Sequence, residues 1–273
     1  MYITKTYPKQ LGKYIKLFYS VRASGSDRLV NYVHRRLPDG TLDVVFNLGS
    51  AVDFSRDSAI FSEMPQVSIT GLHPDRNFII YKGEVNLVGV VFQPAYAHLF
   101  VNDTLDNFKE CTLNADLIFG QSVYPLLDRL KEASDEQDRH ALLEEYLYHY
   151  MKGKEDAYAM DRISNSIRQI HQLEGNVDIS TLYKTNYMSE RSFRRKFIEY
   201  VGMAPKQYAT IIRVKAFSKR YETSRGAYID VVNALGYEDQ SHFSKDFKKI
   251  VGVNPKLYFE QLNVIAEKFI HLI

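Results

Sequence analysis

The chain of 273 residues contains one cysteine, Cys111. An intrachain disulfide or a cysteine-based metal site therefore cannot form, and so few cysteines fit a reducing compartment. Long apolar runs are missing too. The N-terminus has no signal-peptide core, and runs such as residues 87–92 are far shorter than the ~18 residues that span a bilayer. We expect a cytoplasmic protein with no membrane role.

Signatures of catalysis are also absent. The sequence contains no Gly-x-Ser-x-Gly, no Gly-rich phosphate loop and no His-Glu-x-x-His. His34 and His73 lie on or beside expected strands, yet no His-x-His pair or third histidine accompanies them. We expect no enzyme activity, no catalytic residues, no metal site and no cofactor.

The charge is small overall and unevenly distributed. The net charge is +2, but residues 158–273 hold 18 Lys and Arg against 12 Asp and Glu, a net +6, and residues 1–157 hold 17 against 21, a net −4. Neutralising DNA phosphates requires a basic surface. The C-terminal half is therefore the half expected to bind nucleic acid.

The basic half contains an internal repeat. YMSERSFRRKFIEYVGMAPKQY, from Tyr187, aligns at a constant shift of 50 with YEDQSHFSKDFKKIVGVNPKLY, from Tyr237. Two copies are too few for a solenoid, so they indicate two small modules of one kind.

Each copy has the start and stop signals of a helix. In pairs, these are Ser189 and Asp239 as N-caps, Gly202 and Gly252 as ends, and Pro205 and Pro255 as starts of the next element. The apolar residues between them repeat at the i, i+4, i+7, i+8 spacing of one helical face, namely Phe193, Phe197, Tyr200 and Val201, and Phe243, Phe247, Ile250 and Val251. We expect this face to be buried, with the phenylalanines in the core rather than stacked on bases.

A shorter apolar segment precedes each helix and ends in a tight turn. Asn186 and Gly236 stand at the two turns, and both residue types adopt positive φ easily. Helix, tight turn and a second helix with one basic-leaning polar face is typical of a helix-turn-helix unit. A helix over 207–221 is expected to hold the two units about one DNA turn, roughly 34 Å, apart.

Residues 160–260 resemble the C-terminal DNA-binding domain of the AraC/XylS family of bacterial transcription regulators. The resemblance is carried by GYEDQSHFSKDFKK, from Gly236, and VGVNPKLY, from Val251. It implies two helix-turn-helix units that bind double-stranded DNA, with RNA polymerase as a possible partner. Tyr183 departs from the small residue usual there, and the implied base-facing residues are Arg191, Arg194, Arg195, Gln240, Ser241 and Lys245.

The chemistry of these residues suits that role. The fork of an arginine can bind guanine O6 and N7, and Gln240 has the donor and acceptor for adenine. Lys206, Lys248 and Lys256 stand near helix ends or a turn from the base-facing row, so we expect them to hold phosphates. A merely solvated charged face remains the alternative.

The N-terminal half predicts a β-rich domain. Its β-type runs, separated by turn residues, are 14–21, 29–36, 42–48, 67–70, 78–81 and 85–92, which indicates an antiparallel barrel or sandwich of the jelly-roll kind. Helical spacing then covers 95–101, 114–119, 123–131 and 137–152. The last helix is amphipathic, and it packs either on its own domain or in a homodimer.

The run 36–49, with 71–73 and 88–94, resembles an uncharacterised β-rich domain found in a subset of AraC-type regulators. The chain is thus predicted to be an α+β multidomain protein. A sensing or dimerisation domain would cover 1–153, a polar linker 153–157, the double helix-turn-helix domain 158–263 and a tail 264–273. The first domain could hold a small-molecule effector in an aromatic-lined pocket. An alternative interpretation is a jelly-roll enzyme for metal or sugar chemistry with an accessory helical domain.

Overall fold

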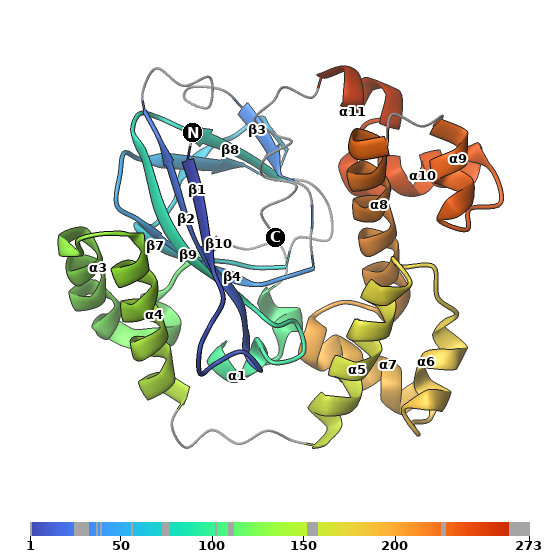
Figure 1. Ribbon diagram of the computed structural model, residues 1–273, viewed down its shortest axis with the longest axis horizontal. Helices are drawn as coiled ribbons and strands as arrows, with labels where there is room; N and C mark the ends of the chain where they lie inside the picture. The colour runs from blue at the N-terminus through green and yellow to red at the C-terminus, as the bar shows by residue number, and fades with distance from the viewer. Residues whose placement is uncertain are drawn as a thin grey trace.

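The computed structural model describes residues 2–24, 33–36, 38, 40–55, 57–72, 77–101, 103–108, 112–151, 158–224 and 228–261. A β-rich N-terminal region and a helical C-terminal region lie side by side (Figure 1). This is the predicted α+β architecture. The linker predicted at 153–157 and the tail predicted at 264–273 lie outside the described residues.

The N-terminal strands pair antiparallel in two sheets. The six-stranded sheet has the order β1 (Tyr2–Thr6), β2 (Ile15–Ala23), β9 (Val85–Phe92), β4 (Asp43–Asn47), β7 (Val67–Thr70) and β10 (Thr112–Asn114). The four-stranded sheet has the order β3 (Val33–Arg36), β8 (Asn77–Tyr81), β5 (Val52–Ser55) and β6 (Ser62–Glu63). Among the described strands none pairs between the two sheets, so the fold is a sandwich and not a closed barrel.

Alternation along β9 divides the domain into two cores. Val88, Val90 and Phe92 face the core shared with the helices, whereas Leu87 and Val91 face the space between the sheets. The core between the six-stranded sheet and the helices continues into the C-terminal region, so it joins the two halves of the molecule.

The N-terminal helices cover one face of the six-stranded sheet. They are α1 (His98–Val101), η1 (Leu105–Phe108), α2 (Asp116–Phe119), η2 (Gly120–Ser122), α3 (Val123–Glu132) and α4 (Glu136–Met151). Leu143, Leu147 and Met151 of α4 are buried, and α4 contacts β1, β2 and β9. Of the two interpretations of this helix, packing on its own domain is therefore confirmed.

Two polar residues of α4 enter the core beside these leucines. The His140 ring lies 2.9 Å from Ser20 Oγ through Nε2 and 2.8 Å from Thr6 Oγ1 through Nδ1. Arg139 donates from Nε to the Leu130 carbonyl at 3.0 Å. Burial lowers the pKa of His140 below its usual value. The His140 bonds fix α4 to β1 and β2, and the Arg139 bond fixes it to α3.

The C-terminal region consists of helices. They are α5 (Tyr158–Gln172), α6 (Ile179–Thr185), α7 (Glu190–Val201), α8 (Pro205–Ser224), α9 (Tyr228–Ala234), α10 (Gln240–Val251) and α11 (Pro255–Gln261). Figure 1 shows α8 running from the first group, α5 to α7, to the second, α9 to α11. The predicted helix 207–221 is thus confirmed, slightly longer at both ends.

Candidate nucleic-acid interface

The helices α7 and α10 begin and end where the sequence predicts. Ser189 Oγ accepts a hydrogen bond from the Ser192 amide at 3.3 Å, and Asp239 Oδ1 accepts one from the His242 amide at 2.7 Å. Both helices end at a left-handed glycine. Capping of this kind satisfies amides that have no partner within the helix.

The predicted buried faces are buried. The aromatic residues of the two stripes, Phe193, Phe197, Phe243 and Phe247, are at most 1% exposed. In the second unit, the Phe243 ring packs 4.1 Å from the ring of Phe217 on α8. These phenylalanines are core residues and are not available to stack on bases.

The opposite faces of the same helices are exposed. All nine residues predicted to contact DNA have exposed side chains, namely Arg191, Arg194, Arg195, Lys206, Gln240, Ser241, Lys245, Lys248 and Lys256. The arrangement leaves basic and amide groups on the surface of both units. Their contact with DNA remains a prediction.

One basic residue of α7 is not part of the exposed row. Lys196 Nζ lies 2.9 Å from Glu199 Oε1 and 3.1 Å from the Tyr200 hydroxyl. The hydrogen bond to Glu199 raises the pKa of Lys196, with Tyr200 adding to the effect. Lys196 therefore bonds to residues of its own helix. It is not part of the exposed row that Arg191, Arg194 and Arg195 form.

The turn of the first unit differs from the prediction. Asn186 has φ −95°, and the positive φ, 52°, belongs to Tyr187. The Asn186 side chain is buried. Its amide donates to Ser166 Oγ at 2.9 Å and to the Leu182 carbonyl at 2.8 Å. In the second unit Gly236 has the positive φ, 71°, as predicted.

Backbone hydrogen bonds show why the constant shift of 50 fails at the turns. The Tyr187 amide donates to the Lys184 carbonyl, as the Gly236 amide does to Asn233. The next amides, of Met188 and Tyr237, donate to carbonyls five residues back in both units. Tyr187 thus corresponds to Gly236, at a shift of 49, and the match of Tyr187 with Tyr237 is wrong. The second unit has one extra residue before its N-cap.

Tyr183, the other departure of the first unit, is half-buried at the edge of the core, with its ring 6.4 Å from that of Phe193. The larger side chain is therefore accommodated without displacing the phenylalanine stripe.

The two units are joined by more than α8. Arg213 of α8 donates from Nη2 to the Gly175 carbonyl at 2.8 Å, and its guanidinium lies 5.0 Å from the Tyr237 ring. Arg220 also forms an ion pair with Glu174. Because Gly175 belongs to the first unit and Tyr237 to the second, these contacts fix one unit relative to the other. No sequence pattern marks Arg213, since only the fold brings these segments together.

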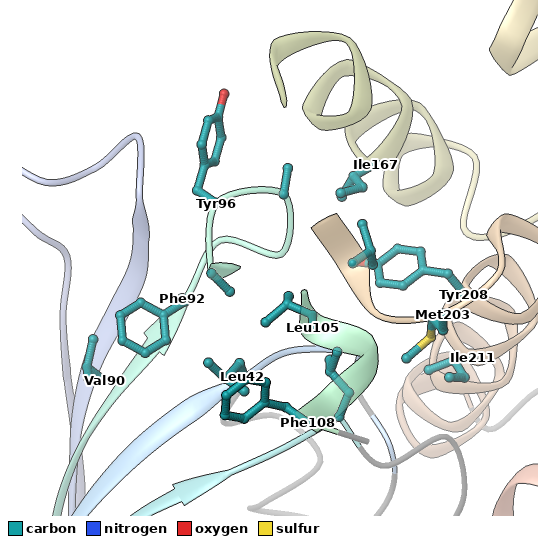
Figure 2. Close-up of a cluster of buried hydrophobic side chains, with 14 of the residues drawn as sticks. Leu42, Val90, Phe92, Tyr96, Leu105, Phe108, Ile167, Met203, Tyr208 and Ile211 are labelled. Carbon is teal, nitrogen blue, oxygen red and sulfur yellow. The ribbon is translucent and has the colours of Figure 1, made fainter. Parts of the chain in front are cut away.

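The first unit also packs against the N-terminal domain. Figure 2 shows Leu42, Phe92, Leu105 and Phe108 on one side of a continuous apolar cluster, and Ile167, Met203, Tyr208 and Ile211 on the other. The helix η1 contacts α7. Contacts of this kind link the N-terminal domain to the end of α7 and the start of α8.

Two glycines make the approach close. A Cβ atom at Gly202 would lie 2.9 Å from the Leu105 carbonyl oxygen, and a Cβ atom at Gly40 would lie 2.4 Å from Cε2 of Tyr208. Both glycines also have positive φ. No larger residue fits either position without displacing its neighbour.

Polar contacts surround this apolar cluster. The Tyr96 hydroxyl donates to Asp161 Oδ1 at 2.7 Å, and Lys13 Nζ lies 3.3 Å from the same oxygen. Burial, and then the bond to Asp161, raise the pKa of Tyr96 to about 12. The His98 and Tyr200 rings stack with their centroids 4.5 Å apart.

Asp43 is buried between the sheets, where Asp43 Oδ2 accepts from the Tyr19 hydroxyl at 3.2 Å. His73, Cys111 and the side chain of His34 lie outside the described residues. In the part that is described, no three His, Cys, Asp or Glu residues are grouped to hold a metal ion. None of the described helices has the length and apolar character to cross a bilayer.

Comparison with known proteins identifies two families. Residues 183–261 match the family described as a helix-turn-helix domain, and residues 7–114 match a domain of unknown function (DUF6597). An uncharacterized HTH-type transcriptional regulator of Haemophilus influenzae is 24% identical over 95 residues, which cover 35% of this chain and 32% of that protein. The F1 operon positive regulatory protein of Yersinia pestis is 32% identical over 83 residues, which cover 30% and 27%.

The alignments thus span about a third or less of the length of these relatives. Among solved structures, ToxT from Vibrio cholerae aligns over 90% of this chain and 98% of its own, with a TM-score of 0.48 and 12% identity.

Proposed function

We propose that this chain, which carries an AraC-type helix-turn-helix domain at residues 183–261 and a DUF6597 domain at residues 7–114, is a sequence-specific DNA-binding transcription regulator. The observation that carries the proposal is the repeated unit itself. Each unit buries an aromatic stripe of its second helix and leaves the opposite, polar face exposed. Helices presented in this way enter the major groove of DNA.

The two units differ in the groups that they present. The first offers three arginines, whose forks suit guanine, and the second offers Gln240, Ser241 and Lys245. In the proposal these rows read base edges, and Lys206, Lys248 and Lys256 hold phosphates. One chain then reads two half-sites on one side of the duplex.

We propose that the N-terminal domain regulates the DNA-binding half. Its contacts reach α7 through η1 and reach α8 through Gly40 and Tyr208. Whether the input is a small-molecule effector or a second copy of the chain, it would reach the DNA-binding half through this surface. A change in the N-terminal domain would act first on the first unit.

Selection of duplexes from a random pool by the purified protein tests the proposal. We expect a recovered consensus, and Arg195→Ala or Lys245→Ala should lose about 1 to 3 kcal/mol on that site and little on a scrambled duplex. Lys256→Ala should weaken both duplexes alike and reduce the salt dependence by about one counterion. Recovery of no preferred sequence would overturn the proposal.

Lys256→Ala is expected to lower affinity for the consensus and the scrambled duplex by the same ratio. If Arg195→Ala did so too, the base-reading row would be misplaced. Circular dichroism of each variant would show that loss of binding does not reflect loss of fold.

A further inference from the structure

Tyr187 is held in an unusual conformation and an unusual place. Its φ of 52° is one that bulky residues rarely adopt. Its side chain is 87% exposed, the largest exposed fraction among the large apolar and aromatic side chains of the described residues. Tyr187 is therefore a residue whose backbone conformation disfavours it and whose ring has no core to fill.

The backbone of Tyr187 is fixed on both sides. Its amide donates to the Lys184 carbonyl at 3.0 Å, and its carbonyl accepts from Arg162 Nη1 at 3.1 Å. The residue before it, Asn186, is held by the buried bonds of its own side chain. The direction in which the ring leaves the protein is thus set by the fold of the first unit.

The second unit has no equivalent group. A Cβ atom at Gly236, which corresponds to Tyr187, would lie 2.3 Å from Nδ2 of Asn176. A side chain there would have to displace the exposed Asn176 side chain, whereas the first unit carries a full tyrosine at the same point of its turn. The difference between the units is local and does not depend on the basic rows.

Tyr187 stands in the chain just before the helix that carries the proposed DNA-binding row. Ser189, two residues later, caps α7, and Arg191 begins the exposed arginine row. The amino end of a helix favours negative charge, and tyrosine hydroxyls are among the groups that bind DNA phosphates. A residue before the helix and outside the row of Arg191, Arg194 and Arg195 is placed to meet the backbone of the DNA rather than its base edges.

We infer that Tyr187 is a DNA-binding residue whose hydroxyl donates a hydrogen bond to a phosphate at the edge of the groove that α7 enters. The inference rests on the proposed function and adds a contact that only the first unit makes. It also explains why a tyrosine stands at a turn position where glycine is easier to accommodate.

Two substitutions test this, with binding to consensus and scrambled duplexes measured across a salt series. Tyr187→Phe removes only the hydroxyl and should weaken both duplexes about fivefold to tenfold, with the melting temperature and the salt slope unchanged, because the phenol carries no charge. Tyr187→Gly should raise the melting temperature and yet weaken binding. Tyr148→Phe, at a half-exposed tyrosine of α4, is the control and should leave binding unchanged.

The outcomes separate the inference from the function. If the unaltered protein prefers its consensus and Arg195→Ala loses that preference while Tyr187→Phe binds normally, the inference is overturned and the function stands. A loss confined to the consensus duplex would place the hydroxyl on a base, which also overturns the inference. If the unaltered protein shows no preference for any duplex, the proposed function itself fails.

Discussion

Single residues decide the stability of the two helix-turn-helix units, because each unit is small and its core contains few side chains. Phe197 and Phe247 are fully buried, and Phe247 lies 5.5 Å from the Tyr258 ring. Replacing either with alanine removes an aromatic ring that the neighbours cannot replace. We expect Phe197→Ala or Phe247→Ala to lower the free energy of unfolding by about 3 to 5 kcal/mol.

Urea denaturation followed by circular dichroism measures this loss. Leu117→Ala, at a leucine that is 69% exposed, is the matched control and should change the free energy of unfolding little. A transition at unchanged urea concentration for both phenylalanine variants would show that the stripes do not hold the units together.

His140 makes the stability depend on pH. Its pKa is lowered in the folded protein, chiefly by burial, whereas the unfolded chain has a histidine pKa of about 6.5. At a pH between about 6.5 and the lowered pKa of the folded protein, His140 therefore binds a proton in the unfolded chain but not in the folded protein. Stability from this group is complete above about 6.5 and falls as the pH falls through that window.

His140→Gln keeps a hydrogen-bonding side chain but removes the titration. We expect the unaltered protein to lose more free energy of unfolding between pH 7.5 and pH 5 than the variant, as measured by denaturant titration at each pH. Equal losses in the two proteins would show that His140 is protonated in the folded state as readily as in the unfolded chain.

The glycines that end α7 and α10 have the same conformation but different surroundings. Gly202 and Gly252 both close their helix at left-handed φ, 74° and 83°. Gly202 is buried against Leu72 and Leu105 of the N-terminal domain, and Gly252 is partly exposed. For Gly252→Ala we expect the conformational penalty of a left-handed alanine, about 1 to 2 kcal/mol.

Gly202→Ala carries the same penalty and in addition drives a methyl group into Leu105. We expect its melting temperature to fall well below that of Gly252→Ala, and the comparison cancels the backbone effect. Equal melting temperatures would mean that the N-terminal domain does not bear on the end of α7.

The elements that the sequence predicts well are those with local signals. Ser189 and Asp239 cap their helices as expected, because capping depends on residues within one turn. The short strands β5, β6 and β10 and the edge strand β1 were not predicted: β5 and β10 form by pairing with the distant strands β8 and β7, and β6 is only two residues long. The turn of the first unit was misplaced for the same reason: Asn186 bonds to Ser166 on α5, and that contact shifts the positive φ to Tyr187.

In the whole molecule, the N-terminal domain packs against the first helix-turn-helix unit, and the first unit packs against the second. The buried stripes and exposed polar faces of α7 and α10 could be predicted from helical spacing, but the surface between the domains could not. Gly40 and Tyr208 are 168 residues apart in sequence and carry no motif that relates them. Arg213 likewise joins Gly175 to Tyr237 only in the folded chain. These contacts, together with α8, set the separation of the two helix-turn-helix units.

We propose that both units bind one duplex at a fixed separation. The helix α8 has 20 residues and is therefore about 30 Å long, close to one turn of DNA. The direct test is the affinity of the full chain for duplexes in which the two selected half-sites are about 10 base pairs apart or are moved apart by five or ten further base pairs. We predict the tightest binding at the original spacing and about tenfold or greater weakening at both insertions, because α8 and the Arg213 contacts cannot stretch. Equal affinity at all three spacings would show that the two units do not bind one duplex at a fixed separation.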